Sequence, residues 1–271
     1  MRSPVTEIRG GYLEVQGVRL AYDEAGEGPP LLCLHTAGMS SLEWRFALPF
    51  FAAHGYRAVA PDLPGHGKSL LRAWRPIETV HDFAEVVRAL AQALGLERPV
   101  AIGCSLGGDI VLDLAAHHAA GLRAAVCCAA GAQTRTFPPA FLERGREDAG
   151  IPSFHELNFY RGEASSGRGA LPERVREIQW LRRRSDPKVT IADLTAWNAQ
   201  DLRGRLRAVT CPVLLIWGED DIACPREAVE RTRAELPDAE LVVLPGIGHF
   251  PMMESLEFND LVLDFLKRKG I

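Results

Sequence analysis

The chain opens with alternating apolar positions and then changes to short, continuous apolar runs. In residues 11–23, apolar and polar side chains alternate on each side of a two-residue gap, which predicts an amino-terminal β-hairpin. Six later runs are short, apolar and bounded by glycine, proline or polar residues, as buried strands are. These runs lie at residues 31–34, 57–60, 100–102, 122–130, 213–217 and 240–244.

Between these runs, apolar positions recur at the spacing of an α-helix. Residues 80–94 place their apolar side chains on one helical face, and the segments around 44–51, 226–236 and 254–268 also fit helices. Strands that alternate with helices predict a parallel sheet. We therefore expect an α/β fold, with an eight-stranded, mostly parallel sheet and helices on both faces.

Residues 135–205 interrupt this alternation. They are charged, arginine-rich and mostly helical in pattern, with an apolar stripe over 171–181 and a glycine-rich stretch at 162–169 that predicts a flexible connector. The sheet pattern resumes afterwards, so the block is an insertion in one domain. We expect a core of residues 1–134 and 206–271, with the insertion as a helical cap over the carboxyl ends of the strands, where open α/β sheets bind ligands.

A G-C-S-L-G motif at residues 103–107 joins the strand at 100–102 to a helix. A strand that turns directly into a helix strains the central residue, and glycine two positions away on either side avoids a collision with the opposite arm. The hydroxyl of Ser105 is then raised above the sheet, and the amide of Leu106 points to where an oxyanion would form. Ser105 is the candidate nucleophile, and a serine in an ordinary glycine turn is the alternative.

A serine nucleophile needs a base, and the base needs a carboxylate that orients it. His249 and the acidic residues Glu219, Asp220 and Asp221 follow the last two predicted strands, so both kinds of side chain lie at the carboxyl edge of the sheet. The chain order of serine, acid and histidine is typical of hydrolases with a strand–turn–helix nucleophile. Spacing alone leaves the choice among the three acids open.

Composition narrows the function further. The net charge of −4 argues against a nucleic-acid partner, and 47% hydrophobic with 24% charged residues is ordinary for a globular protein. The bias toward arginine over lysine indicates a bacterial coding habit. Most cysteines lie in or beside apolar runs, and neither a signal core nor a membrane-spanning run is present, so we expect a cytoplasmic protein without membrane contact. No closely spaced Cys/His set predicts a metal site.

Five motifs carry a family resemblance: L-H-T-A-G at 34–38, D-L-P-G-H-G-K-S at 62–69, G-C-S-L-G-G at 103–108, W-G-E-D-D at 217–221 and G-H at 248–249. Together they resemble the α/β-hydrolase superfamily, in its small, cofactor-free bacterial branch of esterases, lactonases and carbon–carbon bond hydrolases. The resemblance covers nearly the whole chain. Dehalogenases and epoxide hydrolases of the superfamily have aspartate at the elbow, so the serine sets this chain apart from them.

The resemblance implies a triad of Ser105, His249 and Asp221, because the family's G-x-x-D pattern places its acid three residues after the glycine. It also implies that the amides of Leu106 and Ala37 form the oxyanion hole. No cofactor and no metal are implied. In the oxyanion loop a threonine replaces the family's usual glycine, and the residues His35, Asp62 and His66 around it are interpreted as structural.

The sequence says less about the substrate than about the catalytic residues. We expect Met39 and Phe250 on the floor of the pocket and Trp180 from the cap as substrate contacts, which indicates a small, mainly apolar substrate. The arginines at 182–184 are interpreted as solvated surface; one of them turned inward would bind a substrate carboxylate. Activity should rise through about pH 6–7 as His249 becomes neutral.

The leading hypothesis is hydrolysis of a carboxylic ester or related acyl bond through an acyl-enzyme. The alternative is an enol-lactonase or a hydrolase that cleaves a carbon–carbon bond of a vinylogous diketone, which would need a polar cap group for a second charge. A non-catalytic ligand receptor on the same fold is a third class, disfavoured because every triad residue is present. The sequence makes no prediction about the oligomeric state.

Overall fold

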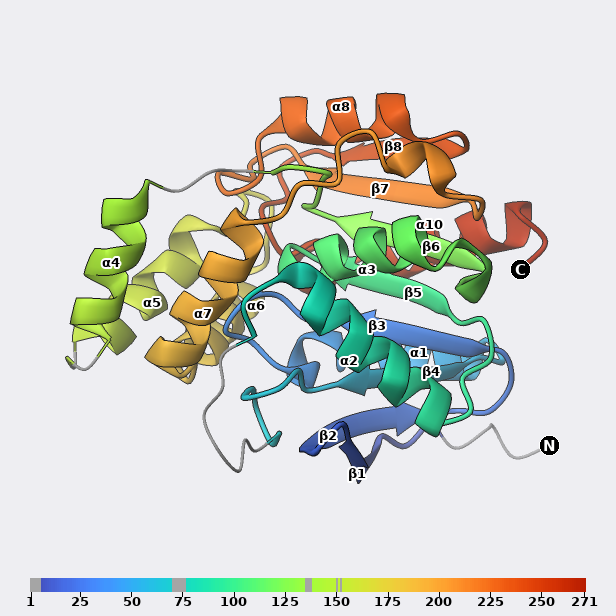
Figure 1. Ribbon diagram of the computed structural model, residues 1–271, viewed down its shortest axis with the longest axis horizontal. Helices are drawn as coiled ribbons and strands as arrows, with labels where there is room; N and C mark the ends of the chain where they lie inside the picture. Colours follow the sequence, from blue (N-terminus) through green and yellow to red (C-terminus); the bar gives the residue numbers. More distant parts are fainter. Residues whose placement is uncertain (1–5, 70–76, 135–137, 150, 152) are drawn as a thin grey trace.

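The computed structural model of the chain describes residues 6–69, 77–134, 138–149, 151 and 153–271. Its centre is an eight-stranded sheet in the order β1-β2-β4-β3-β5-β6-β7-β8 (Figure 1). β2 is antiparallel to both of its neighbours, β1 and β4, and every other neighbouring pair is parallel. The predicted sheet is therefore confirmed. The strands are β1 (Arg9–Val15), β2 (Val18–Ala25), β3 (Pro30–Leu34), β4 (Arg57–Pro61), β5 (Val100–Cys104), β6 (Ala124–Cys128), β7 (Val213–Gly218) and β8 (Ala239–Leu244).

The first two strands form the predicted hairpin around a two-residue turn. Gln16 and Gly17 have φ angles of 50° and 78°. Positive φ at both central positions gives a turn whose twist matches that of the paired strands. Val15 therefore lies directly opposite Val18.

Helices cover both faces of the sheet, as the alternating pattern predicts (Figure 1). On one face α2 packs beside α3, and on the other α1 packs beside α10. Every residue of β5, β6 and β7 is buried between these layers, which explains why these strands are continuous apolar runs. The helices of the core are α1 (Ala47–Ala53), α2 (Val80–Ala93), α3 (Leu106–His117), α8 (Arg226–Glu235) and α10 (Phe258–Arg268).

Two predicted helices are interrupted. The helix expected around 44–51 is a short 3-10 turn, η1 (Ser41–Trp44), followed by α1, and the helix expected over 254–268 is α9 (Pro251–Glu254) followed by α10. The second break has a physical cause. The Glu254 side chain turns back to accept hydrogen bonds from the amides of Gly248 (2.7 Å) and Phe250 (2.9 Å), and the next residue is extended.

The inserted block between β6 and β7 is helical and lies at the end of the sheet to which the parallel strands point (Figure 1). α5 packs tightly along α6, so a Cβ on Gly162 would lie 2.8 Å from the Cα of Gln179. The predicted start of the block at residue 135 lies outside the described residues. The helices of the block are α4 (Pro139–Asp148), α5 (Ser153–Ala164), α6 (Pro172–Arg183) and α7 (Pro187–Asn198).

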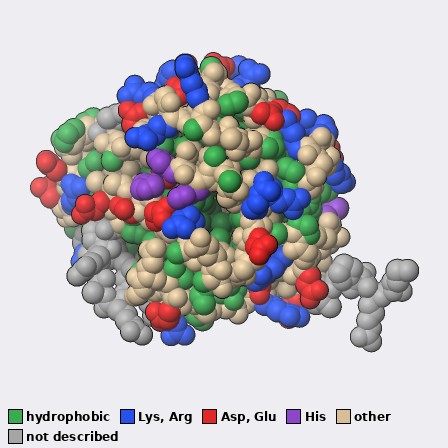
Figure 2. Space-filling view, turned by 45° about the vertical axis from the view of Figure 1, so that its right-hand side comes forward, with side chains coloured by type: hydrophobic (Ala, Val, Ile, Leu, Met, Phe, Trp, Pro, Cys, Tyr) green, Lys and Arg blue, Asp and Glu red, His purple; other side chains and the backbone are tan. Residues whose placement is uncertain are grey.

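Basic and acidic side chains are intermixed on the face seen in Figure 2, and histidines gather in one part of it. All six cysteines are free and buried. Within the described ranges, no helix combines the length and apolar character needed to cross a bilayer.

Candidate active site

Ser105 lies between β5 and α3 with a strained backbone. Its φ of 53° and ψ of −120° fall in a region that residues other than glycine avoid. A Cβ on Gly103 would lie 2.1 Å from the carbonyl oxygen of Gly107, which is the predicted collision across the elbow. A Cβ on Gly107 would instead meet the Leu34 oxygen of β3 at 2.3 Å. Leu106 begins α3, so its amide has no acceptor within the helix.

The histidine is paired with one of the three candidate acids. His249 Nδ1 donates to Asp221, at 2.9 Å from Oδ2 and 3.0 Å from Oδ1, and both side chains are buried. The Asp221 carboxylate also accepts two main-chain amides, which fix its orientation. Asp220 and Glu219 instead form ion pairs with Arg168 at the surface. The geometry therefore distinguishes Asp221 from its neighbours.

Two opposing effects act on the pKa of His249. Burial of the ring opposes protonation, and the charge and hydrogen bond of Asp221 outweigh it, so the pKa lies above the ordinary 6.5. The positive charge of Arg182 acts in the same direction as burial. Because Nδ1 is bonded to the carboxylate, Nε2 is the nitrogen available to a reacting group.

The backbone of His249 is held by the inserted block. Its amide donates to the carbonyl oxygen of Ser165 at 2.8 Å. Gly167 packs so closely on the histidine loop that a Cβ there would lie 2.2 Å from the oxygen of Gly246. The stretch at 162–169, predicted to be a flexible connector, is therefore a tightly packed segment, and its glycines permit backbone-to-backbone contact.

The loop after β3 carries the second predicted oxyanion donor. The amide of Thr36 donates to Glu43 at 2.9 Å, and the amide of Gly38 donates to Asp193 at 2.8 Å. Ala37 lies between them, borders the cavity described below, and its amide has no acceptor among the described residues. Of these three amides, that of Ala37 is therefore the one available to donate a hydrogen bond to a substrate oxygen.

The side chains around this loop connect it to the rest of the fold. His35 Nε2 accepts the amide of Leu63 at 3.0 Å, and Asp62 accepts two main-chain amides. His66 Nε2 donates to Asp193 Oδ2 at 2.7 Å, the same carboxylate that holds the loop. Sequence reasoning did not single out Asp193, because it lies in α7, far along the chain from the loop it contacts.

Ser105 and His249 line the same cavity, whose volume is about 210 Å³. This volume suits a small ligand, since pockets for drug-sized molecules begin near 300 Å³. Thr36 and Ala37 border it from the oxyanion loop. The other lining residues, mostly from the inserted block, are Phe141, Asn158, Arg161, Ser165, Arg182, Thr190, Leu194, Trp197, Ile222 and Ala223.

Two arginines give this cavity a basic character. Arg161 of α5 and Arg182 of α6 both line it, and no acidic side chain among the described residues does. Burial lowers the pKa of Arg182 to about 10, and its Nε is buried without a hydrogen-bond acceptor in the described part of the chain. The interpretation of 182–184 as solvated surface is therefore wrong for Arg182. It shares a helical face with the fully buried Ile178, four positions earlier.

The three predicted substrate contacts lie elsewhere. Met39 and Phe250 are buried in the hydrophobic core. Trp180 is 51% exposed and packs edge-on against Phe159, with ring centroids 5.5 Å apart. Trp180 is two positions from Ile178, which places it on the opposite side of α6. None of the three lines the cavity.

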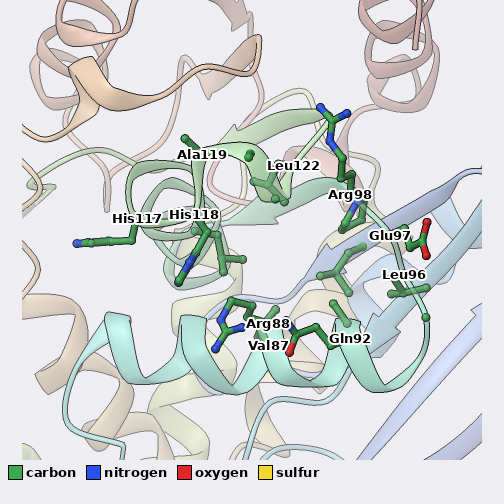
Figure 3. Close-up of a pocket in the computed structure, with 17 residues that line it drawn as sticks. Val87, Arg88, Gln92, Leu96, Glu97, Arg98, His117, His118, Ala119 and Leu122 are labelled. Carbon is green, nitrogen blue, oxygen red and sulfur yellow. The ribbon is translucent and has the colours of Figure 1, made fainter.

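A larger cavity of about 900 Å³ lies outside this site, between α2 and α3 (Figure 3). Its lining is largely apolar and includes Val87, Leu96 and Leu122, with charged side chains such as Arg88 and Arg98. It extends to the residues that precede β5, at the opposite end of that strand from the elbow. The smaller cavity, which holds the serine and the histidine, is the candidate active site.

The fold and the elbow define an α/β protein that presents a serine on a strand–turn–helix. The sequence model of the α/β hydrolase family matches residues 31–261. The chain therefore belongs to the α/β hydrolase family.

Individual relatives differ in reaction. A pimeloyl-[acyl-carrier protein] methyl ester esterase of Nitrosospira multiformis is 31% identical over 255 residues, covering 87% of this chain and 93% of the relative. A 2-hydroxy-6-oxo-6-phenylhexa-2,4-dienoate hydrolase of Burkholderia cepacia is 27% identical over 265 residues, covering 92% and 91%. The solved enol-lactonase of Burkholderia xenovorans aligns with a TM-score of 0.82 over 95% of this chain and 100% of its own, at 22% identity, and shows the shared fold.

Proposed function

We propose that the protein is a serine hydrolase that cleaves a carboxylic ester or related acyl bond of a small substrate. One observation carries the proposal: Ser105, on a strained elbow, lines one cavity with His249, whose ring is bonded to Asp221 at 2.9 Å. The names of the relatives support hydrolysis. The proposal divides the chain into a core, 1–134 and 206–271, and a helical cap, 135–205.

The mechanism follows from the roles of these side chains. His249 Nε2 takes the proton of Ser105 as the hydroxyl oxygen attacks the substrate carbonyl. Asp221 holds the ring tautomer and stabilises the imidazolium, while the amides of Leu106 and Ala37 donate to the oxyanion. His249 then protonates the leaving group. Water repeats the cycle on the acyl-enzyme, releases the acid and restores the serine, so these steps need neither cofactor nor metal.

The cavity also bears on the substrate class. Arg161 and Arg182 share the lining with no acidic side chain of the described residues, although the buried Glu43 lies close enough to act on the charge of Arg182. A guanidinium fork matches the two oxygens of a carboxylate. Apolar side chains such as Phe141 and Leu194 complete the wall. The substrate is therefore an ester that also carries an anionic group, instead of the mainly apolar one expected from the sequence.

The first experiment compares Ser105→Ala with Ser165→Ala on p-nitrophenyl acetate and butyrate. Ser165 is a matched control, because it lies in the same cavity and contacts the histidine through its main chain. Loss of the nucleophile should lower kcat by at least about a thousandfold. The control variant should stay within a few-fold of the wild type. Equal activity of both variants would overturn the proposed nucleophile.

The second experiment tests the anionic group. The wild type should have a higher kcat/KM for p-nitrophenyl hydrogen glutarate than for the neutral p-nitrophenyl pentanoate. Arg182→Met and Arg161→Met should each raise KM for the acid more than for the neutral ester, and the exposed Arg184→Met should change neither. A wild type without preference for the acid would overturn the anionic substrate and leave the serine hydrolase standing.

A second candidate function is that of an enol-lactonase or a carbon–carbon bond hydrolase. The arginine pair favours it, because such substrates carry a second charge that a polar cap group would bind. We would compare kcat/KM for an enol-lactone, a vinylogous diketone acid and the acidic ester. A higher value for either of the first two would reassign the reaction. A folded wild type that turned over none of them would favour the ligand receptor.

A further inference from the structure

Three side chains outside the active site form a compact group between α2 and α3. His81 lies in the first turn of α2, and Asp113 and His117 lie one turn apart on α3. Spacing by four positions puts the last two on the same face of their helix. His117 also lies at the border of the large apolar cavity, and in Figure 3 its ring points away from the other labelled residues.

The distances within the group resemble those of a metal coordination shell. His81 Nδ1 lies 2.8 Å and His117 Nδ1 lies 3.2 Å from the same oxygen, Oδ1 of Asp113. One ligand atom from each of the three lies within 4.8 Å of the other two. Two ligands on a tetrahedral zinc ion are roughly 3.3 Å apart, given metal–ligand bonds of about 2.0–2.1 Å. Small rotations of the two exposed rings would complete the geometry.

The buried charge of Asp113 is a second feature that favours a bound cation. Its side chain is only 2% exposed, and within the described ranges it pairs with no lysine or arginine, only with the two histidines. Buried charged groups are normally paired with an opposite charge or coordinate a metal. The histidine side chains are 48% and 28% exposed, so an ion can reach the group from solvent.

We propose that His81, Asp113 and His117 bind one divalent transition-metal ion of the zinc class. Two imidazole nitrogens and one carboxylate oxygen suit zinc, nickel or cobalt, whereas calcium and magnesium prefer oxygen ligands alone. Water fills the remaining position. On binding, the ion replaces the proton on Nδ1 of His81 and on Nδ1 of His117. It also replaces the contact, at 3.1 Å, between His117 Nδ1 and the main-chain oxygen of Asp113.

Binding has a consequence for stability. α3 is the helix that begins directly after Ser105, and the ion joins its last turn to the start of α2. An ion that binds the folded chain and not the unfolded one raises the melting temperature in proportion to the logarithm of its concentration. The sequence does not predict this site, because 32 residues separate His81 from Asp113.

The test uses the full chain, freed of metal by dialysis against a chelator and titrated with zinc chloride by calorimetry. We expect one equivalent with micromolar affinity and a rise in melting temperature. His81→Ala and His117→Ala should each weaken binding by at least about tenfold. With cobalt, the wild type should give visible absorption that both variants lack.

The matched control is His118→Ala, which removes the next histidine of the chain, bonded to Glu85 at 2.5 Å and outside the group. It should bind zinc like the wild type, as should His249→Ala. Asp113→Asn, checked by circular dichroism, should lose binding while staying folded. A wild type that binds no zinc, or histidine variants that bind it with unchanged affinity, would overturn the proposal.

Discussion

Glu43 accepts two hydrogen bonds from Thr36, one from the main-chain amide at 2.9 Å and one from the hydroxyl at 2.5 Å. This carboxyl group is fully buried, and it holds the residue that precedes the free amide of Ala37. Threonine at this position departs from the glycine usual in the family, and the buried acid is its partner. The pair therefore fixes the conformation of the loop that carries Ala37.

Glu43→Gln should change how stability depends on pH. Burial raises the pKa of Glu43 from 4.5 to about 7, against the opposing effect of its bonds to Thr36. The folded state thus holds this proton more tightly than the unfolded state, and the wild type loses stability as pH rises from about 4.5 through 7. The loss should reach about 3 kcal/mol, and glutamine, which keeps an acceptor for the amide, should not show it.

Urea unfolding between pH 5 and pH 8 measures this difference. The exposed Glu97→Gln serves as the control and should follow the wild type. A Glu43→Gln variant whose free energy of unfolding also followed the wild type at every pH would contradict the prediction.

Arg182→Met should move the pH profile of catalysis. The active form has a neutral His249, and the pKa of His249 lies above 6.5, so kcat/KM of the wild type should rise with pH through a midpoint above 6.5. The charge of Arg182 lowers the pKa of His249, so its removal should shift this midpoint to higher pH. Rates on neutral p-nitrophenyl butyrate from pH 5 to 9 provide the profile. Arg184→Met should leave it in place, and a shift toward lower pH in Arg182→Met would refute the prediction.

Asp221→Asn and Asp220→Asn should differ by orders of magnitude. The first removes the carboxylate bonded to His249 Nδ1 and favours the wrong tautomer, so kcat/KM should fall by about three to four orders of magnitude. The second affects an acid that pairs with Arg168 at the surface, and kcat/KM should change by only a few-fold. Steady-state kinetics on one ester decides. A large loss in Asp220→Asn with a small loss in Asp221→Asn would mean that Asp220 is the acid that orients His249.

Gly167→Ala should affect both stability and rate. The added Cβ would lie 2.2 Å from the oxygen of Gly246, so the loop that carries His249 must move. We expect a loss of about 1–3 kcal/mol in the free energy of unfolding, with a lower kcat. Gly121→Ala is the control, since its nearest neighbour would be 3.7 Å away. Unchanged stability and kcat in the first variant would mean that the packed segment does not position the histidine.

The strands and the elbow could be predicted from the sequence because their causes are local. Continuous apolar runs identify strands buried on both faces, and the glycine at 103 avoids a collision with Gly107, four residues further along the chain. The family pattern also distinguished Asp221, which the structure pairs with His249. Helix ends were less well predicted, because the break after Glu254 depends on amides that only folding brings to its side chain.

The substrate side of the cavity could not be predicted in the same way. Arg182 resembles a solvated residue in a charged run, and its inward direction depends on how α6 packs on the core. Trp180 resembles a pocket residue and is half exposed. In a charged helix, the spacing of the apolar residues does not predict which polar side chains face a cavity.

By itself, the sequence determined the strand order along the chain and the glycine-flanked turn at Ser105, because apolar periodicity and backbone sterics act over a few positions. The tertiary structure alone decided that Arg161 and Arg182 share the cavity of Ser105, and that His81 meets His117 across two helices. Both contacts depend on the packing of elements far apart in the chain. The burial and electrostatic environment of each side chain are set by spatial neighbours, which a local sequence pattern does not reveal.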